Sequence, residues 1–291
     1  MSTRIPESEL IINPNGSIYH LNLKPNQIAD DIIFVGDPDR VSKIAKHFDN
    51  IEFEISKREF KTITGTKNNV RLTVISTGIG TDNIDIVLSE LDALANIDFE
   101  NRTINKLHKS LNIYRVGTSG GLIPEIKIGS IVISHKAIGL DGLMHYYNVD
   151  VDKNDQNLIK KACVALKNIP NITPYVSNGS AILLEQFKSL GRPGITTTAT
   201  GFYGPQGRKI IGQPKSLNFL DDLASIVHQD LKVTNLEMET AGIYGLATLL
   251  GHQAISLNAI LANRADQTFS DNPHQIVEKL IVDVLNIICN K

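Results

Sequence analysis

Short apolar runs alternate with helical patterns along nearly the whole chain. No repeat or Pro/Gly/Ser-rich linker divides the 291 residues. This alternation is typical of α/β proteins. The apolar spacing predicts strands at 32–35, 70–76, 113–116, 131–134 and 255–261, and helices at 41–48, 84–94, 237–250 and from Pro273 onward, with Asn272 as the N-cap of the last one.

Three of the predicted strands run directly into segments that contain glycine. These segments read Gly36-Asp-Pro-Asp-Arg40, Thr77-Gly-Ile-Gly80 and Gly117-Thr-Ser-Gly-Gly121. We expect all three to be turns, and open α/β sheets bind ligands beyond the carboxyl ends of their strands. Glycine lets backbone N–H groups approach an anion closely. Together with Arg40 and Arg115, the turns predict an anion-binding site.

Composition excludes several classes of function. The 29 Lys and Arg residues are balanced by 31 Asp and Glu residues, which argues against a protein that coats nucleic acid. No apolar run is long enough to span a membrane, and the first residues lack the apolar core of a signal peptide. Cys163 and Cys289 fit neither a disulfide framework nor a zinc site. We therefore expect a cytoplasmic protein that binds neither membrane nor nucleic acid.

Common catalytic motifs are absent or lack their structural context. The chain has no phosphate loop of the GxxxxGK[ST] type, and its Gly78-Ile-Gly80 lacks the third glycine of a dinucleotide fingerprint. Residues 117–121 match GxSxG, with Asp266 and His274 following in hydrolase order. A nucleophile elbow needs a helix after the serine, whereas this chain continues into another strand. No HxH or HExxH pair occurs, so no metal site is predicted.

Six motifs follow one another along the chain: Gly36-Asp-Pro-Asp-Arg40, Ser56-Lys-Arg58-Glu-Phe60, Ser76-Thr-Gly-Ile-Gly80, Tyr114-Arg115-Val-Gly-Thr118, Phe202-Tyr-Gly-Pro-Gln206-Gly-Arg208 and Leu236-Glu-Met238-Glu239. In this order they resemble the nucleoside phosphorylase family, and within it the pyrimidine branch of the uridine phosphorylases. The resemblance covers the chain from about Tyr19 to its last helix.

The resemblance implies a fold and an assembly. It predicts one phosphorylase domain over residues 1–291, with a mixed, strongly curved sheet flanked by helices, an N-terminal extension at 1–17 and a surface excursion at 96–110. Because His20 and Arg58 would act across a subunit boundary, a homo-oligomer is implied, at least a dimer and by family a hexamer. The implied reaction is phosphorolysis of uridine to uracil and ribose 1-phosphate, with deoxyuridine and thymidine as further candidate substrates. Inorganic phosphate is the co-substrate, and no organic cofactor is needed.

The resemblance also assigns residues to the phosphate and the ribose. The phosphate would contact Gly36, Arg40, Arg58, Arg115 and Thr118. Arginine suits this role because its planar fork presents paired donors to oxyanions. The ribose would contact His20, Thr118, Glu237, Met238 and Glu239, the last three of which we expect to open a helix.

The base would be held by Gly120, Phe202, Gln206, Arg208 and Arg264. The amide of Gln206 can accept from N3–H and donate to O2 of uracil. Arg208 would donate to O4, where charge accumulates as the base leaves. Arg208, Gln206, Glu239 and Arg115 are therefore the expected catalytic residues.

Two positions depart from the family's patterns. Purine phosphorylases carry an aspartate near Asn263, and asparagine cannot serve as that acid. Bacterial uridine phosphorylases hold a monovalent cation with the equivalent of Glu59 and a serine, but the serine position reads Asn83, which disfavours the cation. A purine phosphorylase, a nucleosidase that uses water, and a non-catalytic nucleoside-binding protein stay as alternatives.

Overall fold

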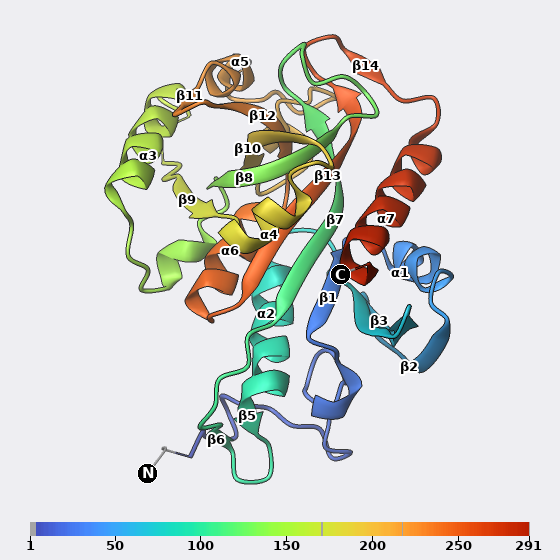
Figure 1. Cartoon of the computed structure of the whole chain (residues 1–291). Helices are drawn as coiled ribbons and strands as arrows, with labels where there is room; N and C mark the ends of the chain where they lie inside the picture. Colours follow the sequence, from blue (N-terminus) through green and yellow to red (C-terminus); the bar gives the residue numbers. More distant parts are fainter. Residues whose placement is uncertain (1–3, 170, 217, 291) are drawn as a thin grey trace.

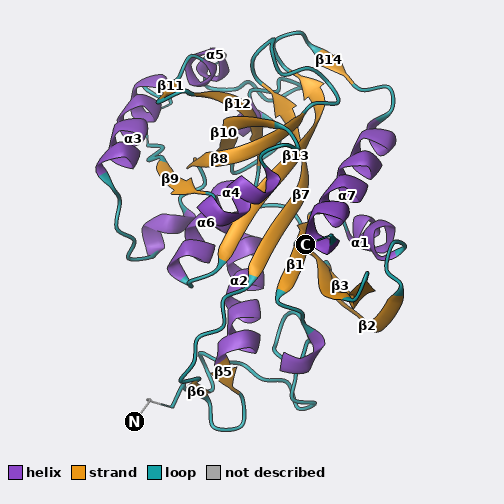
Figure 2. Cartoon of the chain, viewed as in Figure 1, coloured by secondary structure: helices purple, strands orange, loops and turns teal. Residues whose placement is uncertain are grey.

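One large mixed β-sheet forms the centre of the molecule (Figures 1 and 2). The computed structural model describes residues 4–169, 171–216 and 218–290. The strands pair in the order β11-β12-β10-β8-β13-β7-β1-β4-β3-β2, with β9 beside β8 and β14 beside β13. Their bounds are β1 Asp31–Val35, β2 Asn50–Lys57, β3 Phe60–Lys67, β4 Val70–Ser76, β7 Asn112–Gly121, β8 Ile131–Gly139, β9 Tyr175–Asn178, β10 Arg192–Thr198, β11 Val227–His228, β12 Leu231–Glu237, β13 Gln253–Asn263 and β14 Thr268–Phe269.

The expected curvature of the sheet closes part of it into a ring. Strand β7 pairs with β13 along its length, and its last two residues also pair antiparallel with β12. Strands β7, β13, β8, β10 and β12 therefore form a closed circuit, and β1, β4, β3 and β2 extend from it as an open arm. Register shifts in β10 and β13 mark bulges, which bend strands and allow such closure.

Helices cover this sheet on several sides (Figure 2). Helices α2 and α6 pack in one hydrophobic cluster, α1, α4 and α7 in a second, and α3 and α5 in a third. In α7, which begins at Pro273, Val277, Leu280 and Val284 lie on the buried face at helical spacing. The helices are α1 Pro38–Ala45, α2 Thr81–Asn96, α3 Lys153–Ala165, α4 Ala181–Phe187, α5 Phe219–Ala224, α6 Thr240–Leu249 and α7 Pro273–Cys289, and the short 3₁₀ helices are η1 Pro25–Gln27, η2 Leu143–Tyr146 and η3 Gly204–Gln206.

The structure corrects some local expectations. Residues 117–121 are not a turn, because they pair with β13 and with β12 and so extend β7 to Gly121. The helix expected at 237–250 begins only at Thr240, and Glu237 is the last residue of β12. The helix expected at 41–48 begins at Pro38 and ends at Ala45. Asn272 is the N-cap of α7, but its side chain makes no capping hydrogen bond.

The excursion at 96–110 lies between a helix and a strand, as expected, and it contains a small hairpin. Strands β5 (Ile97–Asp98) and β6 (Thr103–Ile104) pair antiparallel. Residues 1–3 of the expected extension at 1–17 lie outside the described residues. The rest of the extension contacts this hairpin, because the backbone N–H of Ile5 donates to the carbonyl oxygen of Arg102 and the Arg102 side chain donates to the carbonyl oxygen of Leu10. In the part of the chain that the structure describes, no helix is both long and apolar enough to cross a bilayer.

Candidate active site

A cavity of about 590 Å³ opens where β1, β4, β7 and β12 end. The parallel strands β1 and β4 carry the first two glycine turns to the same edge of the sheet, so a Cβ on Gly36 would lie 3.3 Å from the carbonyl oxygen of Gly78. The cavity is lined by most of the predicted site residues: Gly36, Arg40, Arg115, Thr118, Gly120, Phe202, Gln206, Arg208, Glu237, Met238 and Glu239. The turns and the motifs that follow them therefore form one site.

Two of the arginines predicted to bind an anion, Arg40 and Arg115, line this cavity. Arg40 comes from the first turn of α1 and donates to the carbonyl oxygen of Val116 at 3.2 Å. Burial, together with the charge of Arg115, lowers the pKa of Arg40. Among the described residues its one hydrogen-bond partner is the neutral carbonyl group of Val116, so Arg40 retains donors for a bound anion.

Arg115 is held by partners on every side. It is 7% exposed, and its guanidinium donates to Asn258 at 2.8 Å and contacts Glu239 at 2.5 Å and Glu237 at 3.0 Å. Burial by itself would lower the pKa of Arg115, but the two carboxylates outweigh it and raise the pKa. The guanidinium is thus a fixed positive charge beneath the cavity.

The two glutamates come from the junction between β12 and α6. Glu237 accepts from the backbone N–H groups of Glu239 and Thr240 and from the hydroxyl of Thr198, so its orientation is fixed. Glu239 accepts from the backbone N–H of Gly80 at 2.9 Å. Burial raises the pKa of Glu239 against the opposing charge of Arg115, and the negative charge of Glu237 adds to the rise. Glu239 is the carboxylate placed to accept from a ligand.

The cavity also carries residues expected at the base. The Arg208 guanidinium lies 3.6 Å over the ring of Phe202 and donates to Gln206 Oε1 at 2.6 Å. Burial, and then the charge of Arg264, lower the pKa of Arg208 to about 10. Gln206 is only 3% exposed, so the cavity presents one oriented amide beside a cation and an aromatic face.

Three predicted site residues do not line the cavity in the described chain: His20, Arg58 and Arg264. Arg264 lies just behind it, where it donates to the carbonyl oxygen of Gly207 and packs beside Gly120. His20 is oriented by Glu90, with Nδ1 2.6 Å from Oε1. Arg58 occupies the turn between β2 and β3, and the neighbouring Lys57 donates to the backbone of Tyr19. The two residues expected to act in trans are therefore held on adjacent segments outside their own cavity.

Sequence reasoning missed other lining residues. Three of them, Ile79, Leu261 and Phe269, are apolar; Leu261 and Phe269 carry no motif that separates them from core positions, and Ile79 lies within the Ser76–Gly80 motif but was given no role. Ser119 was visible only through its GxSxG match; it lies on a strand and accepts from Asn235, so it is not on a nucleophile elbow. The remaining missed residues are Asp37, Pro38, Gly78, Leu236 and Ala262, most of which adjoin predicted ones.

One group of side chains has the composition of a metal site. Asp92, His108 and His252 bring their ligand atoms within 4.8 Å of one another. However, His252 Nδ1 accepts from the backbone N–H of Leu111, so the ring proton belongs on Nε2, the atom that faces Asp92. A protonated nitrogen has no lone pair for a metal, so these residues do not fit one. That a monovalent cation near Glu59 is disfavoured stays a prediction.

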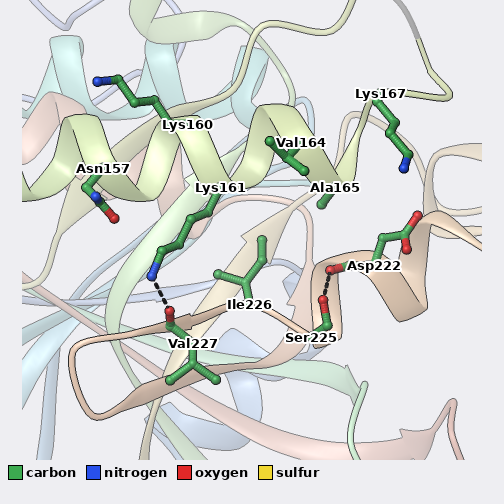
Figure 3. A pocket seen from close by; sticks show the side chains of 10 residues that line it. All are labelled: Asn157, Lys160, Lys161, Val164, Ala165, Lys167, Asp222, Ser225, Ile226 and Val227. Atoms are coloured by element: carbon green, nitrogen blue, oxygen red, sulfur yellow. Dashed lines mark hydrogen bonds between the residues drawn. The ribbon is translucent and has the colours of Figure 1, made fainter.

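A second pocket lies between α3 and the segment from α5 to β11 (Figure 3). In Figure 3 Lys160 points away from this pocket, whereas Lys161 extends across it and donates to the carbonyl oxygen of Val227. It contains no carboxylate pair or buried arginine of the kind seen in the cavity at the strand ends. The arrangement that can do chemistry is the one at the strand ends.

That cavity defines a class of protein: an α/β protein whose strand-end cavity combines two arginines, two buried glutamates and a buried amide beside a cation and an aromatic ring. Comparison with known proteins gives the family. The chain belongs to the phosphorylase superfamily, whose sequence model matches residues 30–289.

Individual relatives agree with this family. A uridine phosphorylase of Thermococcus kodakarensis is 30% identical over 275 residues, which cover 92% of this chain and 84% of that protein. A uridine phosphorylase of Haemophilus influenzae is 30% identical over 252 residues, covering 86% and 88%. A solved Trypanosoma brucei nucleoside phosphorylase, described as showing uridine phosphorylase activity, superimposes with a TM-score of 0.89 at 28% identity over 97% of this chain and all of that one.

Proposed function

We propose that this chain is a uridine phosphorylase, a pentosyltransferase that converts uridine and phosphate reversibly into uracil and ribose 1-phosphate. The observation that carries the proposal is a single cavity lined both by Arg40, Arg115 and Glu239 and by the Gln206–Arg208 pair. These are side chains suited to a phosphate, to the hydroxyl groups of a ribose and to a base. The uridine phosphorylases among the relatives support the same activity.

The reaction needs three things from the protein. Phosphate must be held close to C1′ of the nucleoside, which Arg40, Arg115, Thr118 and the Gly36 turn provide. The ribose must be oriented, and Glu239 accepts from its hydroxyl groups while Met238 packs beside the sugar. Negative charge then grows on the base as the C1′–N1 bond breaks, and Arg208 stabilises it at O4 while Gln206 holds the N3–H and O2 edge. Inorganic phosphate is the second substrate, and no organic cofactor takes part.

The active enzyme is a cytoplasmic homo-oligomer in this proposal. His20 and Arg58 lie outside their own cavity, on adjacent segments, which supports their donation to a neighbouring subunit's site. The minimum assembly is a dimer, and the family favours a hexamer. Each site is complete only when a second copy supplies the 5′-hydroxyl contact of His20 and the phosphate contact of Arg58.

A purine-specific reaction is disfavoured by the environment of Asn263. Its amide donates to the carbonyl oxygens of Ile123 and Ile126, and its Oδ1 accepts from the backbone N–H of Asp266. The side chain is buried and fully engaged, and it does not line the cavity in the described chain. It offers no acid to protonate a purine ring.

The test is a panel of uridine, thymidine and inosine, each with and without phosphate, followed by ultraviolet absorbance. We expect uridine to be cleaved only when phosphate is present, and Arg40→Ala to lose most of that cleavage as an internal control. Base release without phosphate would indicate a nucleosidase, and a preference for inosine would contradict the pyrimidine assignment. Binding of uridine without any cleavage would indicate a non-catalytic binding protein.

A further inference from the structure

Six buried polar side chains from five strands, two of them from β7, form a continuous chain of hydrogen bonds. The chain starts at Arg115 on β7 and passes through Asn258 on β13, Ser134 on β8, Thr196 on β10 and Asn235 on β12. It then returns to β7 at Ser119, whose Oγ lies 2.9 Å from Asn235 Nδ2. The links follow the order in which these strands pair around the closed circuit (Figure 1). Both ends of the chain, Arg115 and Ser119, line the cavity.

Arg115 determines the direction of the first link. A guanidinium can only donate, so the Asn258 atom 2.8 Å from Nη1 must be its carbonyl oxygen. The amide nitrogen of Asn258 then points away from Arg115 and donates to Ser134 at 3.1 Å and to Ser256 at 3.0 Å. Asn258 is wholly buried, so water cannot supply an alternative partner.

Counting protons determines the rest of the chain. Ser134 and Thr196 are also wholly buried, and each hydroxyl has one proton to donate. If Asn235 presented its NH₂ group to Thr196, the hydroxyls of Ser134 and Thr196 could donate only to each other. Only one of them can do so at a time, so the proton of the other would be left unpaired at a substantial cost. With Asn235 Oδ1 facing Thr196 at 2.9 Å, Ser134 donates to Thr196 and Thr196 donates to Asn235. Thr234 donates to the same oxygen, also at 2.9 Å.

The last link leaves one proton without a protein acceptor. Asn235 now donates through Nδ2, so Ser119 Oγ accepts and keeps its own proton. Among the described residues Ser119 Oγ makes no other hydrogen bond, and Ser119 is 9% exposed at the cavity wall. Ser119 lies next to Gly120, against which Arg264 packs, and Arg264 donates to the carbonyl oxygen of Gly207, the residue before Arg208.

We propose that this one-directional chain makes Ser119 an obligate hydrogen-bond donor to a carbonyl oxygen of the bound base, with Asn258, Ser134, Thr196 and Asn235 as positioning residues. The inference rests on the proposed function for the identity of the base. A donor at this point suits the keto oxygens of uracil. A group that can only donate, such as an exocyclic amino group, would face a donor there and be disfavoured.

The substrate arm of the test compares uridine with 2-thiouridine and 4-thiouridine, because sulfur accepts hydrogen bonds weakly. Ser119→Ala should lower kcat/KM for uridine about tenfold, the usual effect of one lost hydrogen bond. The loss should be clearly smaller for one of the two thio analogues, and Ser119→Thr should restore the activity. An equal loss on all three substrates, or no loss on uridine, would overturn the proposal.

The hydrogen-bond chain is tested at Thr196, which does not line the cavity. Thr196→Val should reduce the preference for uridine over the same thio analogue, as Ser119→Ala does. Thr197→Val is the matched control, since Thr197 lies on the same strand and its buried hydroxyl finds no hydrogen-bond partner among the described residues. A purely structural role for Thr196 would lower the melting temperature and leave the preference unchanged, which would contradict the positioning role.

Neutron diffraction of the perdeuterated protein without ligand separates this inference from the proposed function. We expect the Ser119 deuteron to point into the cavity and the Thr196 deuteron to point toward Asn235. A Ser119 deuteron directed at Asn235 would refute the chain direction whatever the substrate. If wild-type protein fails to cleave uridine while the deuterons lie as expected, the proposed function fails and the donor assignment holds for another carbonyl ligand.

Discussion

Gly117 is the position where a single methyl group should do the most damage to the site. A Cβ built on Gly117 would lie 1.8 Å from Nη1 and 2.6 Å from Cζ of Arg115, so the guanidinium cannot stay where it is. Its movement would break the contacts to Asn258, Glu237 and Glu239. Losing one partner of a buried ion pair typically costs ~3–5 kcal/mol, and we expect Gly117→Ala to lower the free energy of unfolding by that amount.

The measurement is urea unfolding together with phosphate binding by calorimetry. Phosphate affinity should fall at least about tenfold, because Arg115 loses the orientation that its partners impose. Gly212→Ala is the matched control, since nothing lies within 4 Å of a Cβ at Gly212. A Gly117→Ala protein within ~0.5 kcal/mol of wild type, a normal value for a neutral surface substitution, would refute the assigned packing of Arg115.

Three further predictions concern the reaction. Arg208→Ala should lower kcat for uridine far more than it weakens phosphate binding, because Arg208 lies at the base end of the cavity; equal losses in rapid kinetics and calorimetry would count against its role. Burial raises the pKa of Glu239 despite Arg115, so Glu239 takes up a proton at a higher pH than an ordinary glutamate. We therefore expect kcat/KM to decline as the pH is lowered, with the midpoint of this decline above ~4.3, the usual glutamate pKa. Glu239→Gln should remove this acid limb. The stability of the fold depends on pH in the opposite sense. The raised pKa of Glu239 stabilises the folded state below the pKa that this carboxyl group has in the unfolded chain, and the stabilisation is lost as the pH rises through the higher pKa of the folded state. Co-expression of Arg40→Ala with Arg58→Ala should restore about a quarter of wild-type activity if sites are shared in symmetric dimers, because half the dimers are mixed and each has one intact site; no recovery would show that Arg58 acts in its own subunit or not at all.

Residues that belong to local motifs were predictable from sequence. Gly36 and Arg40 follow a recognisable buried strand, and the structure places both at the cavity. Gln206 and Arg208 are found by their spacing in the FYxxQxR motif, and they meet at 2.6 Å. The positions of these residues at the cavity were predictable because they are encoded within a few consecutive residues.

Other expectations failed because pairing between distant strands outweighed local preference. Residues 117–121 contain three glycines and look like a turn, yet β12 and β13 pair with them and keep them extended. Glu237 looks like the start of a helix, but it pairs with Thr198 of β10 and ends a strand. Register across a sheet is set by contacts that no single segment contains.

By itself, the sequence determined the α/β class, two of the three glycine turns and the family, since each depends on short-range pattern. Only the tertiary structure closed the sheet through β7 and β12, and so decided that Arg115 and Ser119 are the two ends of one hydrogen-bond chain. The residues between them are spread from Ser134 to Asn258 and carry no shared motif. Their order comes from which strands are neighbours, and the direction of their protons comes from the rule that a buried donor must find an acceptor.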